Sequence, residues 1–255
     1  MGFTKDSRHV GLARALSKLG YCSRSQAAVL IRAGRVMLNG TTRKDPEAPV
    51  RLQRDRMEVD GRAVNAASRI YLMLNKPRGV VTTASDEKGR ETVYSYLDEE
   101  LPWVGPVGRL DKASEGLLLL TNDSKWASRI SDPETHLDKT YHAQVGVLAD
   151  ENLAAALVRG VRIESQEMLR AKRARVLRTG ERNAWLEIVL DEGKNRQIRR
   201  MFDGLGIEVL RLIRIAIGPL QLGQITKGQF RSLTGEEKHS LDKELETSGT
   251  PHQSP

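Results

Sequence analysis

The sequence predicts an α+β protein in which a small basic domain precedes a larger domain with a mixed, mainly antiparallel sheet flanked by helices. Two observations support this prediction. Short apolar stretches of strand type outnumber helical ones, and many are joined by hairpin-length polar segments. The charge is also uneven, because residues 1–68 hold 13 Lys and Arg against 6 Asp and Glu, whereas residues 69–255 hold 28 against 27. Such asymmetry predicts a polyanion-binding module attached to a domain with another task.

Composition sets the expected domain boundaries. We expect a flexible lead-in over residues 1–10, the basic domain over 11–63 and a small, polar linker over 64–69. The second domain is expected to cover residues 70–236. Residues 237–255 are expected to form a polar tail with a disordered end, because they contain few apolar residues that could be buried.

Several classes of protein are disfavoured by what the sequence lacks. No apolar run approaches the roughly 18 residues that suggest a membrane span, and the N-terminus has no apolar signal segment. Because Cys22 is the single cysteine, neither an internal disulfide nor a cysteine metal cluster is expected. The P-loop, the dinucleotide-binding glycine pattern and zinc-ligand spacing are also missing. We therefore expect a cytoplasmic protein without a metal site.

The basic domain is expected to consist of two short helices and a hairpin. Apolar residues recur at helical spacing over residues 12–19, and Gly20 would end that helix. Ser23 and Gln26 have the spacing of a capping box for the second helix. The dipeptide at 39–40 is Asn-Gly, which strongly favours a hairpin turn.

This arrangement resembles the RNA-binding domain of ribosomal protein S-four and its relatives, the αL motif. The resemblance rests on residues 19–28 and 31–40. It implies that a basic helix face lies on structured RNA, with Arg24, Arg32 and Arg35 as phosphate contacts that set affinity but do not read sequence. The alternative is a solvated basic face without a partner. The clustering of charge within this motif favours RNA binding.

The second domain is expected to begin with an apolar strand over residues 70–74 and a turn over 75–79. The remaining elements follow from alternation, helical spacing and caps. Strands are expected over 80–83, 139–147, 171–177, 184–190 and 208–217, and helices over 92–97, 124–130 and 151–158.

Residues 108–123 contain the most informative stretch, a charged cluster followed by four leucines, 117–120. The leucine run predicts a short buried strand, which would hold the loop before it in place. Asp111 lies in that loop, between Arg109 and Lys112. An isolated loop aspartate is usually a salt bridge or a turn cap. A nucleophilic aspartate must be ionised, and a neighbouring cation favours that state.

A second informative stretch is the helix expected within residues 192–206. Four apolar residues recur at helical spacing, so this helix should pack on a core. Arg199 borders that apolar stripe and should be partly buried, whereas Arg200 lies opposite it and should face solvent. Arg109, Lys112 and Arg199 are thus candidate partners for Asp111. The apolar stripe consists of Ile198, Met201, Phe202 and Leu205.

Residues 108–123 resemble the catalytic motif of pseudouridine synthases, of the bacterial ribosomal small-subunit type. The resemblance extends, in the order of that family, to four further motifs and covers about residues 11–235. It implies the pseudouridine synthase fold and the isomerisation of uridine to pseudouridine in ribosomal RNA. It also implies that no metal or organic cofactor takes part, and we expect a monomer without a membrane partner. The further motifs are residues 75–79, 139–141, 192–201 and 217–220.

The resemblance also implies roles for individual residues. Asp111 would be the nucleophile, Tyr141 would stack on the uracil and Arg199 would pair with Asp111. The N1–C1′ bond would break and the uracil would rejoin through C5. Attack at C1′, attack at C6 and a glycal route all remain open. We further expect RNA contacts from Lys76, Arg109, Lys194 and Arg196.

Two other functions compete with this one. A non-catalytic RNA-binding or ribosome-assembly factor could keep the fold, but such a factor need not retain Asp111, Tyr141 and Arg199 together. A glycosidase could use Asp111 and Glu115 as its carboxylate pair. The basic first domain and the scarcity of aromatic residues near the motif disfavour a sugar substrate.

Overall fold

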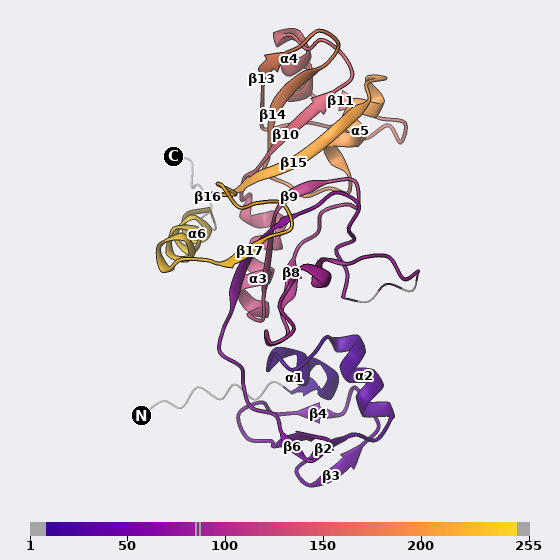
Figure 1. Cartoon of the computed structure of the whole chain (residues 1–255), viewed down its shortest axis with the longest axis vertical. Coiled ribbons are helices and arrows are strands. Elements are labelled where there is room, and N and C mark those ends of the chain that lie inside the picture. The colour runs from indigo at the N-terminus through magenta and orange to yellow at the C-terminus, as the bar shows by residue number, and fades with distance from the viewer. Residues whose placement is uncertain (1–8, 85, 87, 249–255) are drawn as a thin grey trace, which may run out of the picture. The chain divides into compact units, whose positions relative to one another are not determined.

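The computed structural model describes residues 9–84, 86 and 88–248, which divide into two compact units (Figure 1). Unit 1 contains the described residues up to Ile70, together with Asp98–Gly105 and Thr121–Ser124. Unit 2 contains the rest. Most of the expected lead-in, and the end of the expected tail from residue 249, lie outside the described residues. Within the described part, no helix has the length and apolar character needed to cross a bilayer.

Unit 1 has the two helices and the hairpin that its sequence predicts. Helices α1 (Leu12–Lys18) and α2 (Arg24–Arg32) share an apolar core with a sheet of order β3-β2-β5-β6. The capping box of α2 is confirmed: Gln26 N donates to Ser23 Oγ (3.1 Å), and Ser23 N donates to Gln26 Oε1 (3.0 Å). The strands are β1 (Val10–Gly11), β2 (Val36–Leu38), β3 (Thr41–Arg43), β4 (Pro49–Val50), β5 (Met57–Val59) and β6 (Arg62–Ala63), with β1 paired to β4.

Backbone hydrogen bonds attach two further segments to unit 1. In the stretch expected to be a linker, which has no helix or strand, Ala67 N donates to Leu19 O (3.0 Å). In the segment Asp98–Gly105, Trp103 N donates to Gly20 O (3.1 Å). Unit 1 is therefore larger than the basic domain predicted from composition.

Unit 2 is built on a nine-stranded sheet of order β13-β14-β10-β15-β9-β7-β17, with β16 on β15 and β8 on β9. The central pair β9–β15 is parallel, whereas β10–β14, β10–β15, β13–β14 and β7–β17 are antiparallel. The predicted mixed, mainly antiparallel sheet is thus confirmed. The strands are β7 (Tyr71–Lys76), β8 (Gly105–Val107), β9 (Glu115–Thr121), β10 (Lys139–Val145), β13 (Arg173–Thr179), β14 (Ala184–Leu190), β15 (Val209–Ile217), β16 (Leu220–Gln221) and β17 (Phe230–Ser232).

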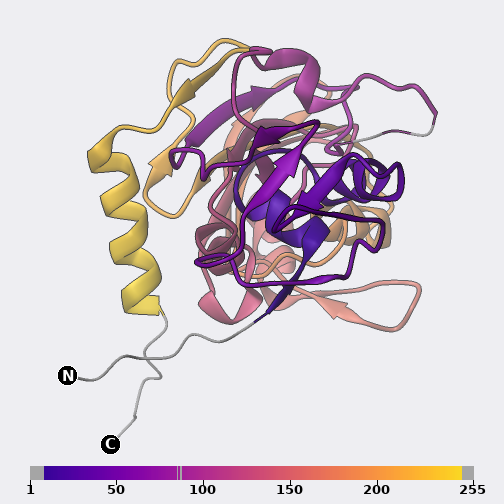
Figure 2. The same cartoon turned by 90° about the horizontal axis from the view of Figure 1, so that it is seen from below.

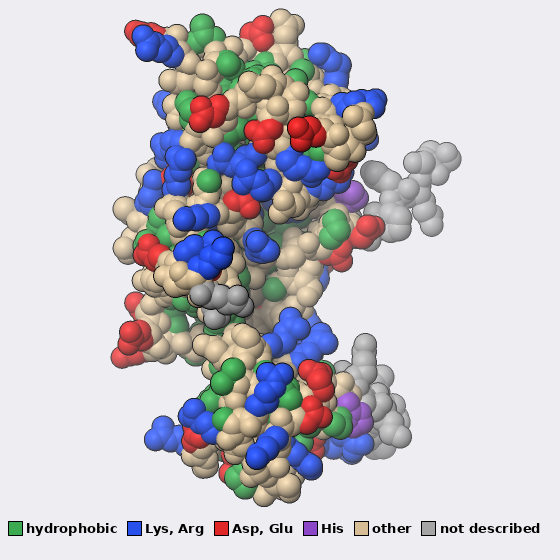
Figure 3. Space-filling view, turned by 90° about the vertical axis from the view of Figure 1, so that its right-hand side faces the viewer, with side chains coloured by type: hydrophobic (Ala, Val, Ile, Leu, Met, Phe, Trp, Pro, Cys, Tyr) green, Lys and Arg blue, Asp and Glu red, His purple; other side chains and the backbone are tan. Residues whose placement is uncertain are grey.

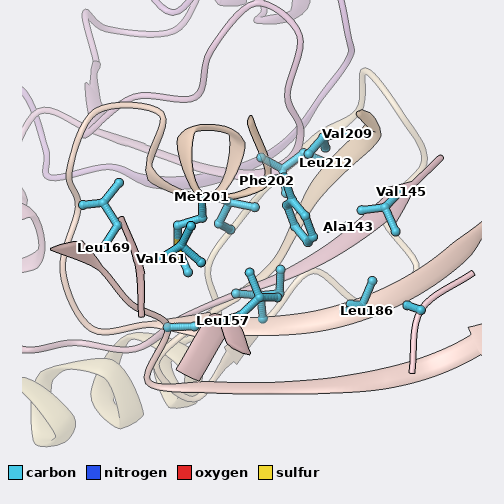
Figure 4. Close-up of a cluster of buried hydrophobic side chains, with 14 of the residues drawn as sticks. Ala143, Val145, Leu157, Val161, Leu169, Leu186, Met201, Phe202, Val209 and Leu212 are labelled. Carbon is cyan, nitrogen blue, oxygen red and sulfur yellow. The ribbon is translucent and has the colours of Figure 1, made fainter. Parts of the chain in front are cut away.

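Two hydrophobic cores hold the helices of unit 2 to this sheet. In the first, α4 (Glu151–Arg159), α5 (Gln197–Gly204) and the small hairpin β11 (Val161–Arg162)–β12 (Met168–Leu169) contribute side chains that meet β10, β14 and β15 (Figure 4). In the second, α3 (Ser124–Ser131) and α6 (Gly235–Ser248) contribute side chains that meet the leucines of β9. Two 3₁₀ turns, η1 (Val93–Tyr96) and η2 (Pro133–Thr135), complete the described elements.

Helix α6 corrects the prediction of a polar tail, because residues 237–248 form most of it (Figure 2). Leu241 and Leu245 are buried in the second core, and Trp126 Nε1 donates to Asp242 Oδ1 (2.8 Å). Two leucines in a charged segment give little periodicity. The helix is stabilised by tertiary packing, which composition does not reveal.

The expected strand over residues 80–83 is also not formed as such. Val81 makes a single bridge to Thr92. Thr82 Oγ1 donates to Leu110 O (2.8 Å), so this segment supports the loop that contains Asp111.

Candidate active site

Asp111 lies in the loop that leads into β9. All seven residues of β9 are buried, so the predicted leucine strand is confirmed and one end of the loop is fixed. The side chain of Asp111 is 29% exposed and lines a pocket with a volume of about 360 Å³. A carboxylate held in this way is accessible to a substrate while its backbone has little freedom.

Lys76, at the end of β7, fixes the backbone around Asp111. Its side chain is completely buried, and Nζ donates to the carbonyls of Pro77 (3.0 Å), Asp111 (3.2 Å) and Ser114 (2.9 Å). Burial lowers the pKa of Lys76 to about 8, although the nearby carboxylates of Asp111 and Glu115 oppose this effect. At neutral pH the ammonium therefore has three N–H donors for three carbonyls. The prediction that Lys76 contacts RNA is wrong, because this side chain does not reach the surface.

The ion-pair partner of Asp111 is Arg196, whose Nη1 lies 3.7 Å from Asp111 Oδ2. Arg199 was expected in this role. Its guanidinium instead donates from Nη1 to Val209 O (3.1 Å) and from Nη2 to Ala113 O (3.0 Å). Arg199 is 8% exposed, as its position beside the apolar stripe predicted, and it holds the loop through the backbone. Helical spacing thus predicted the burial of Arg199, whereas the direct pairing with Asp111 that the family resemblance implied is not formed. Burial lowers the pKa of Arg199, and the charge of Asp111 opposes this effect.

Arg196 reaches Asp111 from a position where helical periodicity gives no information. It is the N-cap of α5 and has φ of 49°, in the left-handed region that few non-glycine residues adopt. The helical angles used to place Arg199 begin only after this residue. Sequence reasoning therefore assigned Arg196 to RNA binding and did not anticipate its contact with the carboxylate.

Tyr141 reaches the same pocket from β10. Its side chain is partly buried against the first core and lines the pocket with Asp111. The structure therefore brings together residues 30 positions apart in the sequence, on a loop and on a strand. This juxtaposition is what stacking on a base held at Asp111 would require.

The cations expected to contact RNA around this pocket have different surroundings. Arg109 is exposed and lines the pocket. Lys194 is exposed, but its Nζ lies 3.2 Å from Glu192 and 3.4 Å from Glu167. Lys and Arg side chains gather on the face of unit 2 in Figure 3, which suits a polyanionic substrate.

Glu115, the second carboxylate of the glycosidase alternative, is not available as an acid. It is 2% exposed and bonded to Arg211 (3.1 Å) and to Lys227. Burial raises its pKa, but the hydrogen bonds and charges of both cations outweigh burial and leave the pKa below its usual value. A general acid in a glycosidase needs the opposite shift.

In unit 1, the three arginines expected to contact phosphates differ in their surroundings. Arg24 and Arg32 are exposed on α2 and have no ion-pair partner among the described residues. Arg35 is also exposed, but its Nε donates to Asp60 Oδ1 (2.9 Å) in a two-point ion pair. Among the residues that the structure describes, no three His, Cys, Asp or Glu side chains are grouped as a metal site would need.

Comparison with protein families gives two matches along the chain. Residues 70–203 match the model of RNA pseudouridylate synthases, and residues 10–55 match that of the S4 domain. The first matched segment contains Asp111, Tyr141, Arg196 and Arg199.

Individual relatives match over nearly the whole chain. The ribosomal large subunit pseudouridine synthase B of Bacillus subtilis (strain 168) is 36% identical, over 90% of this chain and 94% of its own. An RNA pseudouridine synthase of Aquifex aeolicus (strain VF5) is 36% identical, over 92% and 94%. A crystal structure of a pseudouridylate synthase superposes with a TM-score of 0.64 at 30% identity and covers 91% of this chain and 99% of that one.

Proposed function

The chain belongs to the RNA pseudouridylate synthase family, and we propose that it isomerises a specific uridine of ribosomal RNA. The observation that carries this proposal is the pocket in which Asp111, paired with Arg196, faces the same space as Tyr141. The ribosomal substrate is supported by the basic helices of unit 1 and by the name of the B. subtilis relative.

The reaction conserves all atoms of the uridine. The N1–C1′ bond breaks, a C5–C1′ bond forms, one proton leaves C5 and one proton joins N1. No electron acceptor or donor is consumed. We assign the role of nucleophile to the carboxylate of Asp111. Tyr141 would stack on the uracil while the base turns from its N1–C1′ bond to its C5–C1′ bond.

The two arginines near Asp111 have separate tasks in this proposal. Arg196 orients the carboxylate, because its Nη1 lies 3.7 Å from Asp111 Oδ2. Arg199 positions the loop by holding Ala113 O. Of the two, only Arg196 is proposed to act on the carboxylate directly.

Unit 1 would provide binding free energy from a part of the RNA away from the reaction. The target uridine must leave its stack to enter the pocket, at a cost of a few kcal/mol. Phosphate contacts from the exposed Arg24 and Arg32 would offset that cost. Arg35 would contribute less, because Asp60 already compensates its charge.

Substitution of Asp111 tests the proposal. Asp111→Asn is expected to abolish pseudouridine formation, by at least about 10⁴-fold, because an amide is a very weak nucleophile. Affinity for ribosomal RNA should stay within about twofold. Product would be measured by pseudouridine mapping of ribosomal RNA from cells that lack the protein and are complemented with each variant.

Asp98→Asn is the matched control, because Asp98 is exposed and lies outside the pocket. Full activity of Asp111→Asn would remove Asp111 from the mechanism. If the wild-type protein bound ribosomal RNA but no pseudouridine depended on it, the alternative of a non-catalytic RNA-binding factor would be favoured instead.

A further inference from the structure

Arg214 in β15 lies beside Tyr141 because of a β-bulge. Thr140 pairs with Ala216, whereas Tyr141 pairs with Arg214, so Ile215 is an extra residue in the ladder. Directly opposed residues of an antiparallel pair lie on the same face of the sheet. In a regular ladder, with Ile215 opposite Tyr141, Arg214 would oppose His142 and lie on the other face. The bulge therefore turns Arg214 toward the pocket, as bulges near functional sites often do.

The guanidinium of Arg214 is buried but only partly bonded. The residue is 5% exposed, and Nε donates to Leu117 O (2.7 Å). Nη2 is buried without a hydrogen-bond partner, and Nη1 has no acceptor among the described residues. Buried polar groups in native proteins are nearly always paired, so an unpaired edge of a charged group facing a pocket indicates a missing acceptor.

A second cation lies close to this arginine. Lys139 is on the same face of β10 as Tyr141 and lines the same pocket. Burial lowers the pKa of Lys139 and the charge of Arg214 lowers it further, although the charges of Asp138 and Asp191 oppose these effects. No carboxylate lies within ion-pair distance of either side chain in the described part of the chain. Two like charges side by side at a partly desolvated site are stabilised when an anion lies between them.

We propose that Arg214, with Lys139 beside it, binds a backbone phosphate adjacent to the target uridine. This inference rests on the proposed function and adds to it a binding site within the pocket. The two terminal nitrogens of a guanidinium match two oxygens of a phosphodiester, and the lysine adds a point charge. The phosphate would fix the ribose relative to Asp111, so that C1′ stays in place while the base turns.

The charge of the site distinguishes a phosphate from a uracil carbonyl. A neutral carbonyl would accept a hydrogen bond but would leave both cations without an ion-pair partner, with only the more distant charges of Asp138 and Asp191 acting on Lys139. Lys194 and Arg196, which also line the pocket, are already paired with Glu192 and Asp111. Arg214 and Lys139 are the cations of the pocket interior left for an anionic part of the substrate.

The test uses RNA fragments that contain the uridine located by the mapping described above. In separate fragments, the phosphate on the 5′ side or on the 3′ side of this uridine is replaced by an uncharged methylphosphonate. One of these two replacements is expected to lower kcat/KM of the wild type by roughly tenfold to a hundredfold. This factor corresponds to the free energy of a hydrogen bond to a charged group. A methylphosphonate four nucleotides away is the control linkage.

The Arg214→Gln and Arg214→Lys variants are then measured on the same RNA fragments, so that loss of the arginine and loss of the phosphate charge can be combined. Arg214→Gln should lower kcat/KM on natural RNA by a similar factor. In this variant, the methylphosphonate that slows the wild type should cause no further loss of kcat/KM. Arg214→Lys should retain part of the activity that Arg214→Gln loses. Arg159→Gln, which removes an exposed arginine of α4, should behave like the wild type. This pattern of selectivity does not depend on fold stability. The proposal is overturned if neither methylphosphonate lowers kcat/KM of the wild type. It is also overturned if the methylphosphonate lowers kcat/KM of Arg214→Gln as much as that of the wild type.

A second measurement separates this inference from the proposed reaction. Inorganic phosphate should raise the thermal unfolding midpoint of the wild type more than that of Arg214→Gln. This outcome would support the anion site even if no ribosomal uridine were modified. Equal shifts in both proteins would contradict it even if wild-type turnover were confirmed.

Discussion

The cationic side chains of the two units lie in contrasting environments. Arg24 and Arg32 of unit 1 are exposed on α2. In unit 2, Lys76, Arg199 and Arg214 are buried and donate to backbone carbonyls. The same residue types thus serve two purposes. Exposed cations remain available to a partner's phosphates, whereas buried ones hold the loop and strands around Asp111 at the cost of desolvation. Three predictions test this contrast.

The largest expected effect concerns the backbone contact that the buried network requires. A Cβ on Gly116 would overlap Arg214 O and lie 2.9 Å from Arg214 N, and φ of Gly116 is +101°. Gly116→Ala should therefore separate β9 from β15, lower the free energy of unfolding by on the order of 3–5 kcal/mol and abolish activity.

Gly40 of unit 1 is the matched control for Gly116. It also has a positive φ, +76°, but a Cβ there would meet nothing within 4 Å. Gly40→Ala should cost only about 1 kcal/mol, from backbone strain alone. Denaturant unfolding of both variants measures the difference. Equal losses in the two variants would contradict the close backbone contact between Gly116 and Arg214.

A smaller effect is expected from the titration of Lys76. Its pKa is about 8 in the folded protein and 10.5 in its ordinary state, so the unfolded chain binds more protons between these pH values. The free energy of unfolding should therefore rise from pH 8 to pH 10.5, by up to about 3 kcal/mol from this group. The comparison is with Lys76→Met, in which this part of the pH dependence should be missing. Parallel pH profiles for the two proteins would contradict the burial argument.

The smallest effect is expected for the exposed arginines. Arg24→Ala combined with Arg32→Ala should make the slope of log affinity against log salt less steep by about 1 to 2, because two phosphate contacts are lost. Arg35→Ala should change the slope less, because Asp60 already compensates its charge. RNA affinity measured over a salt series tests both. An unchanged slope in the double variant would contradict the assigned contacts.

Local patterns in the sequence predicted the framework of the site. The leucine run predicted a buried strand that fixes Asp111, and helical spacing predicted the partial burial of Arg199. The capping box of α2 and the mainly antiparallel sheet were predicted in the same way. Each of these follows from interactions among near neighbours in the chain, which periodicity and spacing record.

Contacts between distant segments were not predictable in this way. The burial of Lys76 depends on three carbonyls, two of them more than 30 positions away in the sequence. Local patterns could not reveal this burial, so Lys76 was assigned to RNA binding. Arg196 could not be oriented because it precedes the first turn of α5. The role of Arg214 depends on one extra residue in a strand pair, which leaves no signal in alternation. Helix α6 depends on a core assembled from other elements.

The bulge at Ile215 has a consequence for comparing this chain with its relatives. Deleting Ile215 would give a regular ladder in which Arg214 still opposes Tyr141, whereas a regular ladder that kept Ile215 would place Ile215 opposite Tyr141 and turn Arg214 to the other face. A gap at position 215 in an alignment would therefore mark a relative in which the same arginine reaches the pocket without a bulge. An arginine in this column is informative about substrate binding only together with the register of β15 on β10.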